Sequence, residues 1–461
     1  DDPSNFEQIV RTYIGQVRKS SGEPGCSDLR RLRTISDEEL LTNQAIPAVV
    51  KAIFDLYFRD DLDAVRQGSG FLNLSSGSFD ETEFMLPNSL KECIRYALGM
   101  NWYGYSHSLG RWATRTALAQ LESTRFSDRV KVDPAEIIIT LGATSAASSF
   151  SDFVAGGRRR DTLTALCGIP NYPPLVAAIS KRMSVRLVPT PMREHRTDID
   201  DLISLARSGP DLILLQTVTN PTGQRVSESQ LERLIAETPT KTIILLDECH
   251  DVFGRKEVLT VSRKASNVVS IRSLSKQWAA PGVKIGWALG GRDFAARYYE
   301  FASTTYGGPA SLFFLMLEMY AVFEDGWLRG AVSIEDRRAQ LEPGYGLTAT
   351  NLERAYIEYI TARSHFASRV ASSRILTVNR LRNAGLATVT PQYSVNVLAR
   401  LGDSSSYDTH RSLMARKGVA VYPGVLCYLA NRGLVRLSPC IPQTTLEHGL
   451  REIIELYRPL S

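Results

Sequence analysis

Cysteine and histidine are scarce in this chain of 461 residues, with six of each, and neither residue type is clustered. The cysteines include no CxxC pair and the histidines no HxxxH pair, so we expect neither a disulfide framework nor a metal enzyme. No apolar run approaches the roughly 20 residues that span a bilayer. The N-terminal stretch lacks the basic start and apolar segment of a signal peptide. We therefore predict a cytoplasmic protein with reduced thiols, no metal and no membrane partner.

A strong charge of either sign is also missing. The formal net charge is +5 at pH 7, and 22% of the residues are charged against 43% that are hydrophobic. This balance is ordinary for a globular protein and excludes intrinsic disorder. The small positive excess helps an anionic ligand to approach but does not indicate a nucleic-acid partner. The length suits two or three domains, or a large domain accompanied by a smaller one.

The hydrophobic pattern divides the chain into three regions. Residues 1–70, with a capping box at Ser36 and Glu39, are predicted to form a helical N-terminal extension. Residues 71–325 alternate short apolar runs with helical stretches, which predicts a large cofactor-binding α/β domain around a mainly parallel sheet. Residues 326–461 are predicted to form a smaller α/β C-terminal domain. The strands expected in the large domain are Glu136–Thr140, Thr162–Cys167, Val185–Val188, Leu212–Gln216, Thr242–Asp247, Val268–Ile271 and Ile285–Leu289.

Four polar signals follow predicted strands of the large domain, where open α/β sheets place their ligands. The segment Gly142–Thr144 opens a helix and offers backbone N–H groups and a hydroxyl to an anion. Asn220 begins an Asn-Pro-Thr-Gly turn. Asp247 ends an apolar strand, where a buried carboxylate needs a cationic partner. Lys276 follows another apolar strand, and in a dry pocket its lowered pKa makes it a nucleophile suited to a Schiff base.

Two of these signals also have an ordinary structural explanation, since the glycine segment suits a helix cap and the asparagine segment suits a plain turn. Together, however, the four supply a phosphate cradle, a carboxylate for a ring cation and an imine-forming lysine. These are the requirements of pyridoxal 5'-phosphate, which works as an electron sink. We therefore predict this cofactor.

The order Asn-Pro-Thr-Gly, then Asp247, then Ser-Leu-Ser-Lys ending at Lys276 resembles fold-type I pyridoxal-phosphate enzymes of the class I/II aminotransferase family. Over residues 71–461 the chain is similar to aspartate aminotransferase and aminocyclopropane-carboxylate synthase. The resemblance implies an aspartate-aminotransferase-like fold and a small-molecule substrate, either an amino acid or an S-adenosylmethionine-like compound. It also implies a homodimer with shared active sites, in which Tyr105, or its rival Tyr103, reaches the partner's cofactor.

The resemblance carries roles over to single positions. By it, Lys276 is the Schiff-base lysine and proton carrier, Asp247 keeps the pyridine nitrogen protonated and Tyr172 stacks on the ring; these are the predicted catalytic residues. Arg436 pairs with the substrate α-carboxylate through its planar guanidinium. Asn220 is expected to contact both the ring 3-oxygen and the substrate. The predicted cofactor-binding residues are Gly142, Ala143, Thr144, Tyr172, Asn220, Asp247, His250, Ser273, Ser275, Lys276, Lys284 and Tyr105.

Three positions depart from the usual family pattern. Cys249 stands where a small residue lies under the ring, and we expect it to fill space. His250 replaces the usual tyrosine donor to the 3-oxygen; it either donates there and titrates near neutrality, or turns away to a backbone carbonyl. Lys284 replaces an arginine on the phosphate. The N-terminal extension and the segment Asp336–Tyr359 are also long, and they cover the active site, enlarge a dimer interface or only elaborate the surface.

The departures favour a specialised biosynthetic aminotransferase that acts at the α-carbon of an amino acid through a Lys276 Schiff base. The alternative is a β- or γ-elimination or replacement enzyme of secondary metabolism, similar to aminocyclopropane-carboxylate synthase and using an S-adenosylmethionine-like substrate. A remote alternative is a non-catalytic regulator that keeps the same fold. Residues 1–70 show no recognition helix or basic surface that favours such a regulator.

Overall fold

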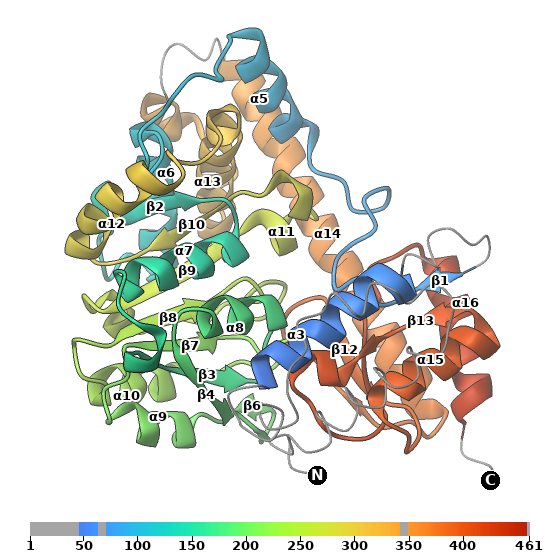
Figure 1. Ribbon diagram of the computed structural model, residues 1–461. Helices are drawn as coiled ribbons and strands as arrows, with labels where there is room; N and C mark the ends of the chain where they lie inside the picture. Colours follow the sequence, from blue (N-terminus) through green and yellow to red (C-terminus); the bar gives the residue numbers. More distant parts are fainter. Residues whose placement is uncertain (1–45, 63–70, 342–348, 459–461) are drawn as a thin grey trace.

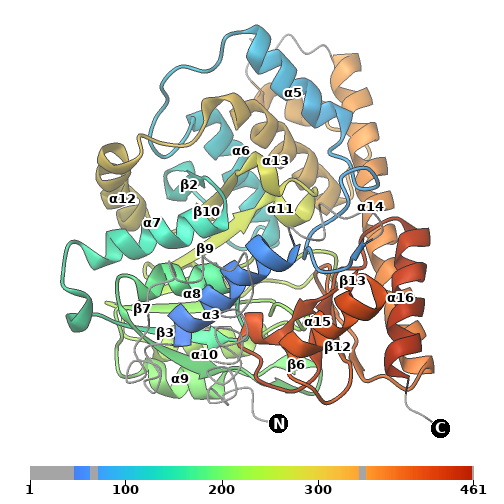
Figure 2. The same cartoon turned by 45° about the vertical axis from the view of Figure 1, so that its right-hand side comes forward.

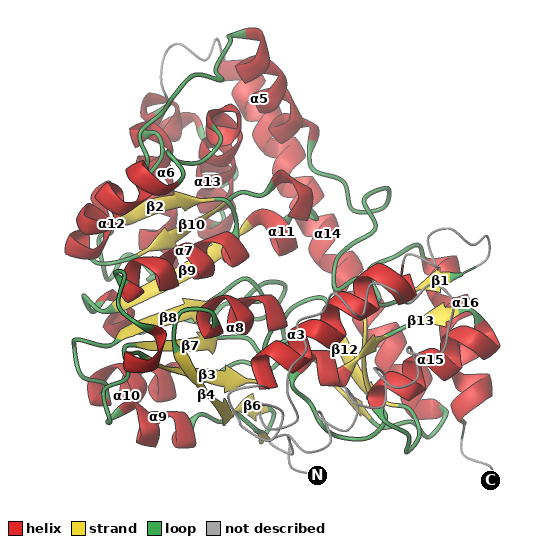
Figure 3. Cartoon of the chain, viewed as in Figure 1, coloured by secondary structure: helices red, strands yellow, loops and turns green. Residues whose placement is uncertain are grey.

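The computed structural model describes residues 46–62, 71–341 and 349–458. A seven-stranded sheet with helices on both faces forms the larger part, and a four-stranded sheet with its own helices forms the smaller part (Figures 1 and 3). This confirms the predicted α/β class with a mainly parallel sheet. The exact domain bounds stay a prediction.

The large sheet has the strand order β2-β10-β9-β8-β7-β3-β4. Only β10 runs antiparallel to its neighbours, so the parallel arrangement expected from near-continuous apolar runs is confirmed. All seven expected strands are present, with ends shifted by two residues at most. They are β2 (Ile137–Thr140), β3 (Thr164–Ile169), β4 (Ser184–Pro189), β7 (Leu212–Gln216), β8 (Ile243–Asp247), β9 (Val268–Ser273) and β10 (Gly286–Leu289).

Helices cover the large sheet on both sides because alternate residues of each strand point to opposite faces. In β8, Leu245 packs into a core that includes α7, α8 and α12, whereas Ile244 and Leu246 pack into a core that includes α9 and α10. Helices α5, α6 and α13 pack beside β2 and β10. Their bounds are α5 (Asn88–Gly99), α6 (Trp112–Arg125), α7 (Ala143–Ala155), α8 (Pro173–Ser180), α9 (Asp200–Ala206), α10 (Glu228–Glu237), α12 (Arg292–Thr305) and α13 (Phe314–Arg329).

The register of the central strands brings their polar ends together. Gln216, the last residue of β7, lies opposite Asp247, the last residue of β8. Strand β9 continues directly into α11 (Leu274–Gln277), which carries Lys276. The carboxyl ends of three neighbouring parallel strands therefore place these side chains at one edge of the sheet.

The smaller part contains an antiparallel sheet with the order β11-β12-β15-β14. The 35-residue helix α14 runs from beside α5 down to this sheet (Figure 1). Strand β1 pairs in parallel with β13, so the chain just after residue 71 packs with the smaller part. The bounds are β1 (Leu72–Asn73), β11 (Thr388–Val389), β12 (Val397–Arg400), β13 (Val419–Ala420), β14 (Tyr422–Pro423), β15 (Leu434–Leu437), α14 (Ala349–Asn383), α15 (Ser406–Lys417) and α16 (Gln443–Tyr457). A separate short hairpin pairs β5 (Met192–Arg193) with β6 (Arg196–Thr197).

The described part of the N-terminal extension is helix α3 (Ile46–Leu56), continued by a π-helical turn, Tyr57–Asp61. Apolar residues such as Val50 and Ile53 bury this helix in the core that it shares with α7 and α8. Helix α3 thus lies between the two parts of the molecule (Figure 2). The predicted capping box lies outside the described residues, as does part of the long segment Asp336–Tyr359. No described helix has the length and apolar character needed to cross a bilayer.

Candidate active site

A cavity of about 210 Å³ lies at the carboxyl ends of β7, β8 and β9, beside the start of α7. Its lining draws on both sheets and on the N-terminal segment. Every site residue predicted from the sequence except Tyr105 lines it: Gly142, Ala143, Thr144, Tyr172, Asn220, Asp247, His250, Ser273, Ser275, Lys276, Lys284 and Arg436. The fold therefore gathers these residues, which are scattered over nearly 300 positions (142–436), into one place.

One end of the cavity is built from backbone and hydroxyl groups. Gly142 has a φ of +87°, which favours glycine, and it begins α7 without a side-chain cap. A Cβ atom on Gly142 would lie 3.9 Å from Ser273 Oγ, which in turn lies 2.8 Å from Ser275 Oγ. The exposed Lys284 also lines the cavity. Open N–H groups at a helix start, two hydroxyls and an ammonium group suit a phosphate.

Asp247 is a buried carboxylate whose partners are neutral. Its Oδ2 accepts a hydrogen bond from Gln216 Nε2 at 2.8 Å, and its Oδ1 accepts one from the Cys249 backbone N–H at 3.1 Å. No cationic nitrogen of the described residues lies within 4.0 Å of it. Because a buried carboxylate without a cation is costly, Asp247 is prepared to receive a positively charged ligand group.

Lys276 is a partly buried amine that donates a hydrogen bond to the Gly77 carbonyl. Burial, reinforced by the charge of Arg436, lowers its pKa to about 8, against the opposing influence of Cys249 and Asp247. A substantial fraction of the side chain is therefore neutral near pH 8. A neutral amine is the form that attacks an aldehyde or accepts a proton.

Arg436, on β15, is a buried cation held by neutral groups. Its Nη1 donates to Asn220 Oδ1 at 3.2 Å, and its Nη2 donates to the Ser75 carbonyl at 2.8 Å. The guanidinium lies 3.8 Å from the centre of the Tyr422 ring. Gly77 makes room for it, since a Cβ atom there would lie 2.5 Å from Nη2. No carboxylate of the described residues is paired with Arg436, so it is available to a ligand carboxylate.

His250 lines the cavity, but its charge behaves differently from the expectation. Its Nδ1 lies 2.5 Å from Ser394 Oγ, so it has not turned away to a backbone carbonyl. Burial, with Lys276 and Arg436 nearby, lowers its pKa well below the usual value. The expected titration near neutrality was therefore wrong, because tertiary packing removes the ring from water. Burial and Asp247 likewise raise the pKa of the Cys249 thiol, which keeps it protonated.

The two predicted tyrosines occupy contrasting places. Tyr172 precedes α8, lines the cavity and packs its ring 5.8 Å from that of Phe54. Tyr105 is fully exposed and does not line the cavity of its own chain. Tyr103 is exposed too, and its hydroxyl donates to Asn101 at 2.9 Å.

Several lining residues were missed by the sequence analysis. Gln216 had a usable signal, since it is a polar residue that ends an apolar strand beside the one ending in Asp247. Gly77 and Tyr422 have no local signal, because their place depends on how the smaller part packs against the larger one. The same holds for Phe58, which reaches the cavity from the N-terminal segment.

The lining residues fit pyridoxal 5'-phosphate. The helix start, the two serines and Lys284 match its phosphate, the unpaired Asp247 matches a protonated ring nitrogen, and the amine of Lys276 matches its aldehyde. These requirements are met by separate groups of one cavity.

Comparison with known proteins agrees with this fit. Residues 69–453 match the family described as aminotransferase class I and II. The aspartate aminotransferase of Pyrococcus abyssi is 22% identical over 89% of this chain and 96% of its own length. Histidinol-phosphate aminotransferase 2 of Pasteurella multocida is 24% identical over 51% of this chain and 61% of its own length.

Solved structures share the fold. The aspartate aminotransferase of Thermotoga maritima superposes with a TM-score of 0.66 at 20% identity, covering 86% of this chain and 95% of its own. The N-succinyldiaminopimelate aminotransferase of Mycobacterium tuberculosis gives 0.68 at 18% identity, covering 86% and 96%. The chain belongs to the class I and II aminotransferase family. Members of this family are pyridoxal 5'-phosphate-dependent transferases, so the predicted family, fold and cofactor are confirmed.

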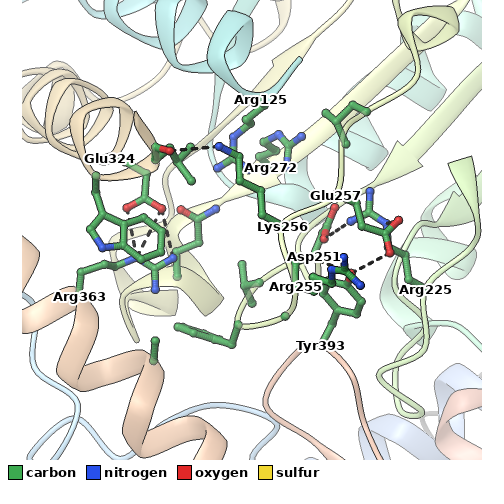
Figure 4. A pocket seen from close by; sticks show the side chains of 18 residues that line it. Arg125, Arg225, Asp251, Arg255, Lys256, Glu257, Arg272, Glu324, Arg363 and Tyr393 are labelled. Atoms are coloured by element: carbon green, nitrogen blue, oxygen red, sulfur yellow. Dashed lines mark hydrogen bonds and ion pairs between the residues drawn. The ribbon is translucent and has the colours of Figure 1, made fainter. Parts of the chain in front are cut away.

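A second cavity, of about 340 Å³, lies between the loop after β8, helix α13 and helix α14 (Figure 4). Its buried arginines have carboxylate partners. Arg272 pairs with Glu122 at 3.0 Å and Arg363 with Glu324 at 3.1 Å. Arg225 pairs with Asp251 at 2.5 Å. This cavity is therefore walled by ion pairs within the protein itself.

Proposed function

We propose that this protein is an aminotransferase that acts at the α-carbon of an amino acid with pyridoxal 5'-phosphate bound in the cavity of about 210 Å³. The observation that carries the proposal is the gathering of Lys276, Asp247 and Arg436 there, each without an ion-pair partner among the described residues. The family membership supports the same conclusion.

The proposed roles follow from the surroundings of each group. Lys276 holds the cofactor through its amine. Once the amine is free of the cofactor, it moves a proton at the substrate α-carbon, since the lowered pKa of Lys276 leaves a large fraction of the amine neutral. Asp247 stabilises a positive charge on the ring nitrogen of the cofactor, and Asn220 contacts the 3-oxygen of the same ring. When bound, the cofactor supplies the electron sink for this chemistry.

Arg436 binds the α-carboxylate of the substrate in this proposal. Its guanidinium is fixed by Asn220, Ser75 and the Tyr422 ring, so little rotamer freedom is lost when the ligand arrives. A guanidinium fixed in this way holds the substrate α-carboxylate in one place and so orients the α-carbon with respect to the Lys276 amine.

We also propose a cytoplasmic homodimer with shared sites. A run of exposed apolar side chains between the end of α5 and the start of α6 supports the dimer: Leu98, Met100, Tyr103, Tyr105 and Trp112. Such a patch is unusual on a monomer. We expect that Tyr105→Phe and Lys276→Ala chains, mixed and reassembled, exceed the summed activity of the two parents, because each mixed dimer holds one unaltered site. Activity equal to the sum of the parents would contradict the sharing.

A single-turnover experiment tests the reaction. The purified holoenzyme is mixed with individual amino acids in excess, and the products are identified by mass spectrometry. We expect one equivalent of 2-oxo acid per site and the aminated form of the cofactor. Release of ammonia or of a substrate fragment, with the cofactor unchanged, would instead indicate elimination or replacement.

A further inference from the structure

Phe58 brings the N-terminal segment into the cavity, and the proposed function assigns no role to this contact. It lies in the π-helical turn Tyr57–Asp61, directly after α3, and it lines the same cavity as Lys276 and Arg436. The sequence alone left open whether the extension covers the site, joins a dimer or only decorates the surface. Its described part contributes a phenyl ring to the cavity.

The Phe58 ring belongs to an apolar wall, which we define as Phe58, Tyr422, Tyr172 and Leu175. The Phe58 ring lies 6.4 Å from that of Tyr422. Phe54 supports the wall from α3, with its ring 4.5 Å from Phe58 and 5.8 Å from Tyr172. Packed aromatic rings of this kind hold one another in place, so the wall keeps its shape.

The wall adjoins the group that is proposed to bind the α-carboxylate. The Arg436 guanidinium lies 3.8 Å from the centre of the Tyr422 ring, and the Phe58 ring also lies near that of Tyr422. A substrate anchored on Arg436 therefore has an apolar surface within a few ångströms of its anchoring point. A substrate side chain that covers this wall gains from the removal of apolar area from water.

The charges of the cavity also favour a substrate with an apolar side chain. Its cationic side chains among the described residues are Lys276, Lys284 and Arg436. The proposed function uses them for the cofactor amine link, the phosphate and the α-carboxylate, and His250 is kept neutral by burial. A second carboxylate on the substrate would find no further cation among the described lining residues beside the apolar wall, and an unpaired buried charge is strongly disfavoured.

We propose, resting on the proposed function, that the amino acid substrate has an uncharged apolar side chain of up to aromatic size and that Phe58 selects it. Phe58 touches neither the cofactor attachment point nor the α-carboxylate in this scheme, so it determines specificity rather than the reaction itself.

Binding of unreactive acids to the holoenzyme tests the proposal independently of turnover. The probes are 3-phenylpropionate, which has an apolar side chain, and succinate, which has a second carboxylate, and their dissociation constants are measured by calorimetry. We expect 3-phenylpropionate to bind at least about tenfold more tightly. Succinate binding as tightly as 3-phenylpropionate, or more tightly, would overturn the proposal.

Variants assign the preference to Phe58. Phe58→Ala should lose most of the preference, Phe58→Leu should retain it, and Phe58→Arg should bind succinate more tightly than the wild type. Phe301→Ala is the matched control, because this partly buried phenylalanine of α12 packs on Phe153 of α7 and does not line the cavity. An unchanged preference in both Phe58→Ala and Phe58→Arg would contradict the assignment, and the arginine variant decides alone if alanine prevents folding.

The single-turnover experiment separates this inference from the proposed function. If aspartate or glutamate yields 2-oxo acid faster than phenylalanine, leucine and methionine do, the substrate class is wrong while the aminotransferase proposal stands. If no amino acid yields a 2-oxo acid, the proposed function fails and the inference fails with it.

Discussion

The cavity around Lys276 and the cavity around Arg272 and Arg363 handle buried charge in opposite ways. In the cavity around Lys276, the charged side chains Asp247 and Arg436 are held by neutral hydrogen-bond partners. In the cavity around Arg272 and Arg363, the guanidinium groups pair with carboxylates of the protein. Figure 4 shows the pair of Arg363 with Glu324. Because unpaired buried charges cost stability, the first arrangement is retained for a ligand, whereas the second serves the fold. The larger of the two cavities is thus the less suited to chemistry.

The largest effect is expected at Lys276. Lys276→Ala should abolish turnover and the covalent link to the cofactor, because the other described lysine that lines the cavity, Lys284, is exposed and lies at its phosphate end. The protein should still fold, since the substitution removes a charge that burial disfavours. Steady-state assays and thermal unfolding measure the two quantities together. Undiminished turnover would refute the assignment of the site.

Breaking an ion pair of the second cavity should show the reverse pattern. Arg363→Met leaves the Glu324 carboxylate buried and unpaired, and we expect the free energy of unfolding to fall by about 3 to 5 kcal/mol. Turnover per folded molecule should change less than about twofold, because neither residue lines the first cavity.

The double variant Arg363→Met with Glu324→Leu provides the control for that prediction. Removal of both charges should recover much of the lost stability, which urea titration can measure. A stability equal to that of the single variant would mean that the pair does not act as a structural unit.

Asp247→Asn should have the next largest effect on activity. The amide keeps the shape of the side chain and hydrogen bonding to Gln216 but removes the charge that stabilises a protonated ring nitrogen. We expect the rate of α-proton exchange to fall by about a hundredfold, comparable to the loss of a major electrostatic element. Exchange monitored by NMR in deuterated buffer measures this rate. A wild-type rate would show that Asp247 has been assigned wrongly.

The smallest effect concerns pH. Because burial lowers the pKa of His250 well below its ordinary value of about 6.5, the ring stays neutral above that pH and gains its proton only in more acidic solution. The absorbance of the holoenzyme should therefore show no additional protonation step between about pH 6 and 7, and His250→Gln should leave that range unchanged. A step in the wild type that disappears in His250→Gln would mean that the ring titrates in this range.

Local patterns predicted much of the fold and of the site. The strands β7, β8 and β9 are apolar runs bounded by polar turns, and Asp247 and Lys276 directly follow two of these runs, so they were found without tertiary information. Phe58 was missed because its position depends on packing between segments far apart in the chain. The neutral state of His250 was missed because burial is a property of the folded molecule.

The ion pairs of the second cavity could not be predicted from local sequence patterns either. The partners of Arg272 are Glu122 and Glu248, and the partner of Arg363 is Glu324, so the ion pairs join residues at no regular spacing. In the sequence these residues look like ordinary surface charges. Only the packing of α6, α13 and α14 against the sheet makes them a buried network.

The central claim is that the cavity with unpaired charges is the cofactor site, and one measurement tests it most directly. The holoenzyme is reduced with borohydride, which makes the lysine link to the cofactor permanent, and the digested protein is mapped by mass spectrometry. We predict a phosphopyridoxyl group on Lys276 at about one per chain and on no other residue. Modification of a different lysine, or none after full loading with the cofactor, would contradict the claim.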